Sequence, residues 1–264
     1  MSEILKEALK RIENNEIIAL ATIVETEGSA PNEKGAKMLV GKNGLISGTI
    51  GGGIIEAKVV EEAKKAIKSG KKKNLQFDLN KEEIGLDETP ICGGKIKIFI
   101  DILMPKEKIL IFGAGHIALC LSRFAKILRF GVIIIDERKE FANRTRFPEA
   151  EKIINEKAAL ALKQFKINPC TYVVIVTKGH LNDEDALISV IKQNVKYVGM
   201  IGSRAKNNII FSHLREKGVT EKQINKIYAP IGLSIGARTP EEIAVSIIAE
   251  IISVKRKTSK KERE

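Results

Sequence analysis

Hydrophobic positions follow different spacings on the two sides of Pro105. Before it, residues 2–15 carry apolar side chains every three or four positions among charges, which predicts an amphipathic helix. Shorter apolar or alternating runs, two of them joined by the Asn43-Gly44 turn signal, predict strands. The predicted strands cover residues 17–24, 37–40, 45–49, 75–79 and 95–102, and a second helix covers 54–69. Residues 1–104 are therefore predicted to form a small α+β domain with a mostly antiparallel sheet.

After Pro105, apolar runs too short for helices alternate with helix-length segments. Strands are predicted at 109–112, 132–135, 172–177 and 197–201. Helices are predicted from after residue 118 to about 129, at 183–192, from after residue 204 to about 217, and from 240 onward. Thr239 is the expected cap of the last helix, with Pro240 in its first turn. The alternation predicts an α/β domain with a parallel, Rossmann-like sheet over residues 105–254, followed by a basic disordered tail, 255–264.

A glycine turn joins the first of these strands to its helix. In the run Gly113-Ala-Gly115-His116-Ile117-Ala118, the first glycine permits a tight turn and the second lets backbone amides approach a phosphate at the positive helix end. Ala118 replaces the third glycine of the usual motif with another small residue. Asp136 follows the next strand, about twenty residues on, where a ribose hydroxyl would be held. This order of elements is typical of a dinucleotide-binding βαβ unit.

The glycine motif alone does not establish a ligand, since it also shapes βαβ units that bind no dinucleotide. His116 lies where a phosphate loop needs no side chain, so its imidazole could bind a metal, bind an anion or cap the turn.

Ligands in open parallel sheets gather beyond the carboxyl ends of the strands. That rule places a further set of residues along one edge of the second domain, namely Thr177, His180, Gly202, Ser203 and Arg204. His180 with Asp183 could form an oriented imidazole or a metal site, while Asp183 could equally cap a helix beside a surface histidine. His213, inside a predicted helix with apolar neighbours, is interpreted as structural.

In the first domain, glycines again carry the signal. Gly51, Gly52 and Gly53 precede a helix and offer amide donors for an oxyanion or phosphate, or else form a turn that needs unusual dihedral angles. Glu56 either compensates the helix dipole, which we favour, or contacts a ligand. Cys92 precedes two glycines and is either an accessible thiol or a small buried hydrophobe.

Composition narrows the classes of partner. The formal net charge is +12, but aromatic residues make up only 5% of the chain, which disfavours nucleic-acid binding and suits an anionic small molecule or an acidic protein. Three cysteines form no disulfide framework. Without a predicted signal peptide or membrane span, a cytoplasmic location is expected.

Several segments in this order resemble the XdhC/CoxI family. They are residues 27–31 (EGSAP), 48–56 (GTIGGGIIE), 92–94 (CGG), 113–116 (GAGH), 177–183 (TKGHLND), 201–204 (IGSR) and 230–248. The resemblance implies an accessory protein for xanthine dehydrogenase and related molybdenum hydroxylases. Such a protein binds molybdenum cofactor (molybdopterin), supports its sulfuration with a cysteine desulfurase, and helps insert it into the client enzyme; the resemblance also implies a homodimer. Asn32 and Ser234 depart from the family pattern, in which arginine and aspartate are common at these positions, so the pterin phosphate is expected to be held differently here.

The predicted function is therefore that of a molybdenum-cofactor chaperone without catalytic residues. The predicted cofactor-binding residues are Gly28, Ser29, Gly51, Gly52, Gly53, Glu56, Cys92, Gly113, Gly115, His116, Asp136, His180, Asp183, Gly202, Ser203 and Arg204. Cys92 is the candidate contact to molybdenum or its sulfur. The alternative is an NAD(P)-dependent oxidoreductase, in which Asp136 would favour NAD by repelling a 2′-phosphate. A binding module with a vestigial or regulatory nucleotide site is a third possibility.

Overall fold

The computed structural model describes residues 2–79, 94–165 and 167–256. The chain divides into two compact units, Met1–Pro105 and Lys106–Glu264. In chain order the elements are α1 (Ser2–Glu13), β1 (Ile18–Gly28), β2 (Lys37–Gly41), β3 (Gly44–Gly48), α2 (Gly53–Ser69), β4 (Lys73–Asp78), β5 (Gly94–Leu103), β6 (Lys108–Phe112), α3 (His116–Ile127), β7 (Gly131–Ile135), β8 (Lys152–Ile154), α4 (Ala158–Ala161), β9 (Thr171–Ile175), α5 (His180–Val190), β10 (Tyr197–Met200), α6 (Arg204–Glu216), α7 (Glu221–Ile224), β11 (Ile227–Tyr228) and α8 (Pro240–Arg256).

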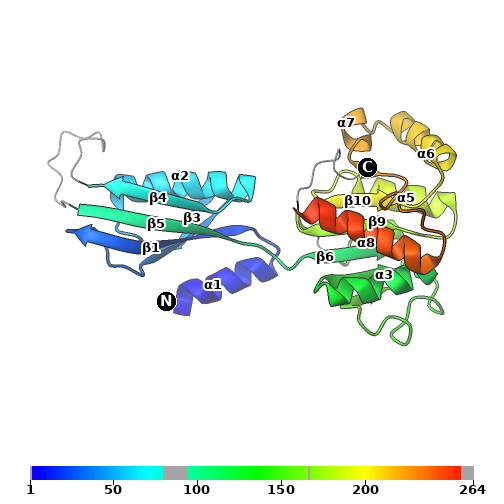
Figure 1. The fold of residues 1–264 in the computed structure, drawn as a ribbon, viewed down its shortest axis with the longest axis horizontal. Coiled ribbons are helices and arrows are strands. Elements are labelled where there is room, and N and C mark those ends of the chain that lie inside the picture. The colour runs from blue at the N-terminus through cyan, green and yellow to red at the C-terminus, as the bar shows by residue number, and fades with distance from the viewer. Residues whose placement is uncertain (1, 80–93, 166, 257–264) are drawn as a thin grey trace. The chain divides into compact units, whose positions relative to one another are not determined.

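The first unit is an antiparallel sheet with helices on both faces (Figure 1). Its strand order is β3-β2-β1-β5-β4, and successive side chains of each strand alternate between the faces. The face that carries Ala19, Ala21 and Ile23 packs against α2. Ile18 and Leu20 face the other way, toward α1. Strand β1 continues to Gly28, beyond the predicted strand end at residue 24. Pairing with β5 extends the strand past a bulge between Ile23 and Glu25.

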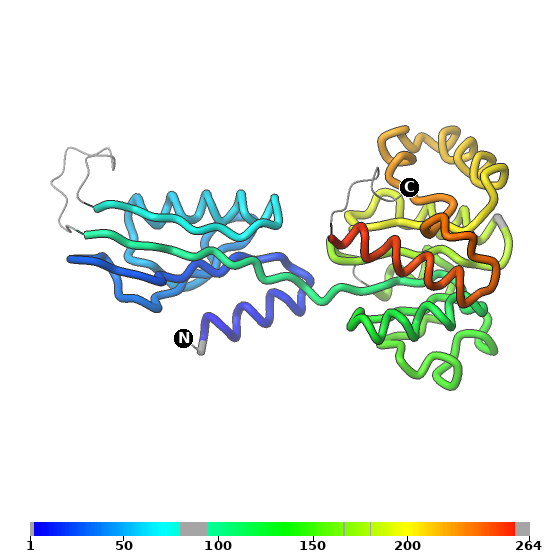
Figure 2. The backbone as a smooth tube through the Cα atoms, viewed as in Figure 1, coloured from blue at the N-terminus to red at the C-terminus, as the bar shows by residue number. Residues whose placement is uncertain are grey.

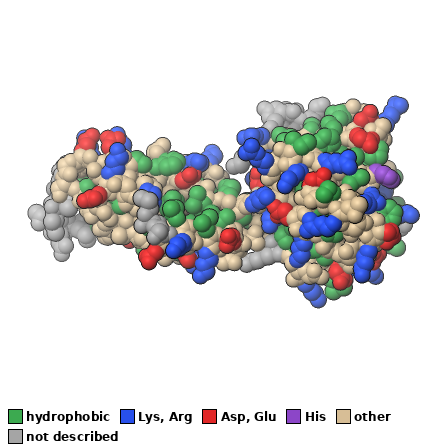
Figure 3. All heavy atoms as spheres, turned by 90° about the horizontal axis from the view of Figure 1, so that it is seen from below, with side chains coloured by type: hydrophobic (Ala, Val, Ile, Leu, Met, Phe, Trp, Pro, Cys, Tyr) green, Lys and Arg blue, Asp and Glu red, His purple; other side chains and the backbone are tan. Residues whose placement is uncertain are grey.

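Helix α1 leaves part of its surface apolar. Figure 3 shows hydrophobic side chains gathered on its exposed side, where Leu5 is 44% and Leu9 60% exposed. On the same view of the second unit, basic and acidic side chains are interspersed.

The second unit is the predicted α/β domain with a parallel sheet. Its strand order is β11-β10-β9-β6-β7-β8, so the chain starts in the middle, winds outward on one side and returns to wind outward on the other. Helices α3 and α8 lie side by side on one face (Figures 1 and 2), and α4, α5, α6 and α7 cover the other. This is the doubly wound Rossmann order, and the direction of winding reverses between β6 and β9.

Local sequence signals account for the start of the last helix, α8. The Thr239 hydroxyl accepts a hydrogen bond from the Glu242 amide at 3.3 Å, and Glu242 Oε2 accepts one from the Thr239 amide at 3.0 Å. This reciprocal capping box, with Pro240 in the first turn, confirms the predicted helix start. Helix α8 continues through Lys255 and Arg256, so these two residues do not belong to a disordered tail as predicted.

None of the helices in the described ranges combines the length and apolar character that crossing a membrane requires.

Candidate functional site

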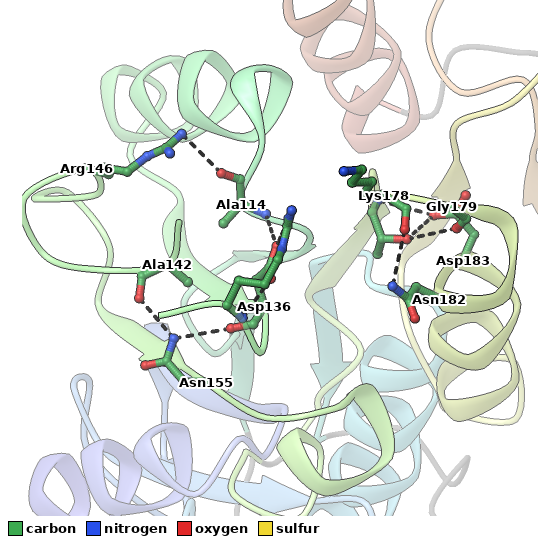
Figure 4. Close-up of polar contacts among 11 residues, drawn as sticks. Ala114, Asp136, Ala142, Arg146, Asn155, Lys178, Gly179, Asn182 and Asp183 are labelled. Atoms are coloured by element: carbon green, nitrogen blue, oxygen red, sulfur yellow. Dashed lines mark hydrogen bonds and ion pairs between the residues drawn. The ribbon is translucent and has the colours of Figure 1, made fainter. Parts of the chain in front are cut away.

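A cavity of about 460 Å³ opens at the carboxyl edge of the parallel sheet, beside the point where the winding reverses. Its walls come from the ends of β6, β7 and β9 and from α4 and α5. Its polar and glycine lining includes Gly113, Asp136, Arg138, Lys157, Lys178 and Asp185. Figure 4 shows Asp136 on one side of this region and Lys178, Gly179 and Asn182 on the other. The volume lies within the usual range for a small-molecule site.

The two glycines of the turn after β6 are required for different reasons. Gly113 has φ +105°, and a Cβ there would lie 2.4 Å from the Val176 carbonyl oxygen on the neighbouring chain segment. Gly115 has φ −74°, and a Cβ there would meet no atom within 4 Å. The fold therefore demands glycine at 113 but not at 115, where the space is open to a ligand. Ala118 is fully buried against the sheet.

Asp136 is bound by the chain itself. Its Oδ1 accepts from the Arg138 amide at 3.1 Å and from Arg138 Nε at 2.9 Å. Its Oδ2 accepts from Arg138 Nη2 at 2.6 Å and from the Ala114 amide at 2.8 Å. Burial alone would raise the pKa of Asp136, but these hydrogen bonds outweigh it and hold the pKa below its ordinary value. The Arg138 pairing also neutralises the charge that was expected to repel a 2′-phosphate.

Asp183 holds two segments at the same sheet edge together. Its side chain is fully buried and accepts hydrogen bonds from the Thr177 amide at 3.2 Å and the Thr177 hydroxyl at 2.6 Å. Lys206, from the first turn of α6, forms an ion pair with its second oxygen. The structure thus gives Asp183 a role in joining the loop after β9 to the first turn of α6. His180 begins α5, and its side chain lies outside the described part of the structure.

The predicted residues after β10 serve the backbone. Ser203 caps α6 by accepting a hydrogen bond from the Lys206 amide at 3.2 Å. Gly202 has φ +153°, and a Cβ there would lie 2.5 Å from Asn207 Oδ1. Neither these two residues nor Arg204 and His116, both exposed, are among the residues that line the cavity. His213 Nδ1 lies within hydrogen-bonding distance of Glu184 Oε2, at 3.0 Å, and its side chain is 48% exposed, so it is not buried among apolar neighbours.

In the first unit, Glu56 occupies the amide donors of the glycine loop. One carboxylate oxygen accepts from the Thr49 hydroxyl at 2.5 Å and from the amides of Ile50 and Gly52, each at 3.2 Å. The Thr49 hydroxyl in turn accepts from the Gly51 amide at 3.1 Å. Gly51, Gly52 and Gly53 all have positive φ, so the turn itself requires all three glycines.

This arrangement adds to the preferred interpretation of Glu56, which lies in the first turn of α2 as expected. Its carboxylate does more than offset the helix dipole, because it fills the anion position of the loop with a group of the chain. The Thr49 hydrogen bond, followed by those from the two amides, lowers the pKa of Glu56 against the opposing effect of burial. Gly28 ends β1 opposite Gly94, and Ser29 next to it is exposed.

Replacing Glu56 with alanine is expected to increase amide exchange at residues 50–52 by roughly 5- to 30-fold, which corresponds to about 1–2 kcal/mol of lost hydrogen bonding. Because the pKa of Glu56 is lowered on folding, this protection is present above the ordinary carboxyl pKa and is lost as the pH falls through the lowered value. Hydrogen exchange corrected for intrinsic rates measures it. Glu61→Ala, which removes only an exposed pair with Lys64, should leave these amides unchanged.

Sequence patterns missed most of the cavity wall. Arg138, Lys157, Asn182, Asp185 and Ser189 line it but were not predicted. Arg138 was detectable in principle, since it stands two residues beyond Asp136, the acid that follows β7. Cys92 lies outside the described residues. Within the described ranges, no group of three or more His, Cys, Asp or Glu side chains could hold a metal ion.

Comparison with known proteins identifies the family to which the chain belongs. Residues 109–251 match the family model described as the XdhC Rossmann domain, and residues 11–78 match that of the XdhC and CoxI family. The chain belongs to this family.

Its relatives are proteins of about the same or greater length. The chain is 36% identical over 256 residues to "Uncharacterized protein YqeB" of Escherichia coli K12, covering 96% of this chain and 46% of that protein. It is 31% identical over 162 residues to a probable xanthine dehydrogenase component of Bacillus subtilis 168, covering 61% of this chain and 47% of that protein. It is 23% identical over 281 residues to "Molybdenum cofactor insertion chaperone PaoD" of Escherichia coli K12, covering 96% of this chain and 88% of that protein. The chain thus spans about half the length of the first two relatives.

A crystal structure described as a xanthine dehydrogenase from Bacillus halodurans shares the fold. The TM-score is 0.53 at 22% identity, over 96% of this chain and 97% of the other.

Proposed function

We propose that this protein binds molybdenum cofactor, supports its sulfuration together with a cysteine desulfurase, and inserts the cofactor into a xanthine dehydrogenase-type hydroxylase. The observation that carries the proposal is the match to a cofactor insertion chaperone along 96% of this chain and 88% of that relative. A similarity that extends over both units supports a shared role better than a match to the Rossmann domain alone, because that fold serves many functions.

The chemistry of the cavity is compatible with such a cargo. The cofactor is anionic through its phosphate and dithiolene groups, and the chain carries a net charge of +12. Arg138, Lys157 and Lys178 offer positioned donors in a cavity that Glu137, Glu156 and Asp185 also line, and the space beside Gly115 is open. A carrier needs to bind and shield its cargo without transforming it, which requires no catalytic residue. The proposal includes a homodimer, which the resemblance to the family implies, and a cytoplasmic location.

Isolation of the protein under anaerobic, native conditions followed by mass spectrometry tests this proposal. Molybdopterin is expected in the isolated protein, and its transfer to a cofactor-free hydroxylase is expected to restore that enzyme's activity. Isolated protein without pterin, and without the ability to activate the hydroxylase when pterin is supplied, would contradict it.

Cys92→Ala tests the predicted contact to molybdenum or its sulfur. Loss of that contact is expected to reduce cofactor affinity roughly tenfold or more, about 1.4 kcal/mol or more of binding free energy. Cys120→Ala is the matched control, since the Cys120 thiol lies on α3 near Glu241 Oε1 at 3.8 Å and is not a predicted ligand. Equal cofactor retention by wild type and Cys92→Ala would remove Cys92 from the site.

A second candidate function is an oxidoreductase that uses NAD(P). It is favoured by the cavity at the winding reversal of the Rossmann sheet, which is where dinucleotides bind in this fold. Tight binding of NADH or NADPH with turnover of a small substrate would support it; a dinucleotide that binds without turnover would leave only a regulatory role.

A further inference from the structure

The acid that usually receives a ribose in this fold has no capacity left to do so. A carboxylate offers about four lone-pair positions. Asp136 uses them for the Arg138 amide, Arg138 Nε, Arg138 Nη2 and the Ala114 amide. Its side chain is only 7% exposed. A ribose hydroxyl could bind Asp136 only by displacing one of these donors.

The group that Asp136 presents to the cavity is the Arg138 guanidinium. Two parallel hydrogen bonds to Asp136 fix its plane, and the centroid of the Phe141 ring lies 4.3 Å from its central carbon. A guanidinium carries five N–H donors, of which these bonds use two. Among the described residues, no other acceptor is bonded to it. Arg138 is 30% exposed and lines the cavity, so its remaining donors are held in place before any ligand arrives.

The charge around this group argues for recognition by geometry. Lys157 and Lys178 line the same cavity, but so do Glu137, Glu156 and Asp185. With the Asp136–Arg138 pair neutral overall, the wall has no excess of positive charge. Attraction of any anion by net charge is therefore weak, whereas a fixed fork of donors suits an oxyanion that accepts two bonds at once.

We propose that this cavity binds a ligand bearing a phosphate monoester, that Arg138 holds the phosphate, and that Asp136 is a positioning residue for Arg138. Two ligands share this chemistry: the phosphorylated pterin of molybdenum cofactor and a dinucleotide with a 2′-phosphate. Assigning the phosphate to the pterin rests on the proposed function, while the preference for a phosphate monoester does not.

Equilibrium binding of four probes to the full chain separates these sources. The probes are the phosphorylated pterin, the same pterin after phosphatase treatment, NADP⁺ and NAD⁺. The two pterins form one pair, and NADP⁺ and NAD⁺ form the other. Within at least one pair, the extra phosphate is expected to increase affinity by roughly 10- to 100-fold, the usual effect of a charge-assisted bidentate contact. Arg138→Gln is expected to abolish the difference. Arg123→Gln, which removes an exposed arginine on α3 that does not line the cavity, should preserve it.

The variant Asp136→Asn distinguishes positioning from net charge. It makes the site more positive by one unit, so attraction by charge alone predicts tighter binding of the phosphorylated probe. Loss of the bonds that orient Arg138 predicts weaker binding, by several-fold, with binding of the unphosphorylated partner unchanged. Urea denaturation of each variant identifies any that fails to fold, and Arg138→Lys, which keeps the charge but not the fork, should also lose most of the preference.

The possible results of these binding measurements support or overturn the inference and the proposed function separately. A phosphate preference for the pterin that depends on Arg138 supports both this inference and the proposed function. A preference seen only for NADP⁺ over NAD⁺ supports the inference but removes the pterin from this cavity. Equal affinity within both pairs, or a preference that survives in Arg138→Gln, overturns the inference whether or not the protein carries cofactor elsewhere.

Discussion

The variant Lys206→Met is expected to lower the free energy of unfolding of the second unit by about 3–5 kcal/mol, because it leaves a buried carboxylate without its counter-charge. The Asp183 side chain is fully buried, and Lys206, whose side chain is 29% exposed, is the cation paired with it. The two hydrogen bonds from Thr177 remain in the variant but do not neutralise the charge. Methionine keeps most of the length of the lysine side chain, so the loss of packing is small.

Tyrosine fluorescence during urea denaturation measures this effect on the second unit alone. The chain has three tyrosines, Tyr172, Tyr197 and Tyr228, all in that unit, and no tryptophan. Adding Asp183→Asn to Lys206→Met removes the stranded charge and should recover about 1–2 kcal/mol.

Lys217→Met is the matched control for the Lys206 variant. Lys217 pairs with Glu184, the next residue of α5, but is itself 54% exposed, and Glu184 keeps its bond to His213. A cost below about 1 kcal/mol is expected there. A Lys206→Met variant as stable as wild type would show that Asp183 does not depend on this ion pair.

The Rossmann part of the fold could be predicted from the sequence because its signals are local. Ile109 to Phe112 is an apolar run that ends at glycine, and short apolar runs likewise mark β7 and β9. The start of α8 follows from the two residues Thr239 and Pro240. These elements bury apolar side chains on both faces of the sheet, which is why their composition is so uniform.

The elements that were missed are too short to show a period. Strands β8 and β11 have three and two residues, and they form by pairing with strands already in place. The polar stretch after Asp136, long enough for a helix, instead forms turns. Asn155 Nδ2 donates to the carbonyls of Asp136 and Ala142 at 3.2 and 2.9 Å, and Arg144 bonds the Ala150 carbonyl. Such contacts depend on residues brought together only by the finished fold.

The positions of the candidate site residues could be predicted from the sequence, but the contacts that these residues make could not. Asp136 and Glu56 stand at the places the motifs indicate, yet both carboxylates bind groups of their own chain. Spacing along a sequence shows that an acid reaches the end of a strand or a helix. Whether its oxygens are free depends on side-chain partners such as Arg138 and Thr49, which no motif specifies.

Gly113→Ala and Gly115→Ala are expected to have opposite consequences, although the two glycines are two residues apart. Alanine at 113 must adopt φ +105° with its Cβ 2.4 Å from a backbone oxygen. Strain of about 1–2 kcal/mol and overpacking of about 1–3 kcal/mol together predict a loss of about 2–5 kcal/mol in the free energy of unfolding. Alanine at 115 meets neither obstacle, and its stability should stay within about 1 kcal/mol of wild type, the difference between these residues at a helix N-cap.

For cofactor binding, Gly115→Ala is the substitution expected to have the direct effect. If the open space beside Gly115 is where the backbone approaches the cofactor, a methyl group there should weaken cofactor binding roughly tenfold or more while the protein stays folded. Tyrosine-monitored denaturation and cofactor titration of the same preparations give both quantities. Wild-type affinity in Gly115→Ala would place the cofactor away from this helix end, whereas wild-type stability in Gly113→Ala would show that the turn can relax away from Val176. Because the two substitutions add the same methyl group to the same loop, any difference between them reports what lies next to each position and not the chemistry of the change.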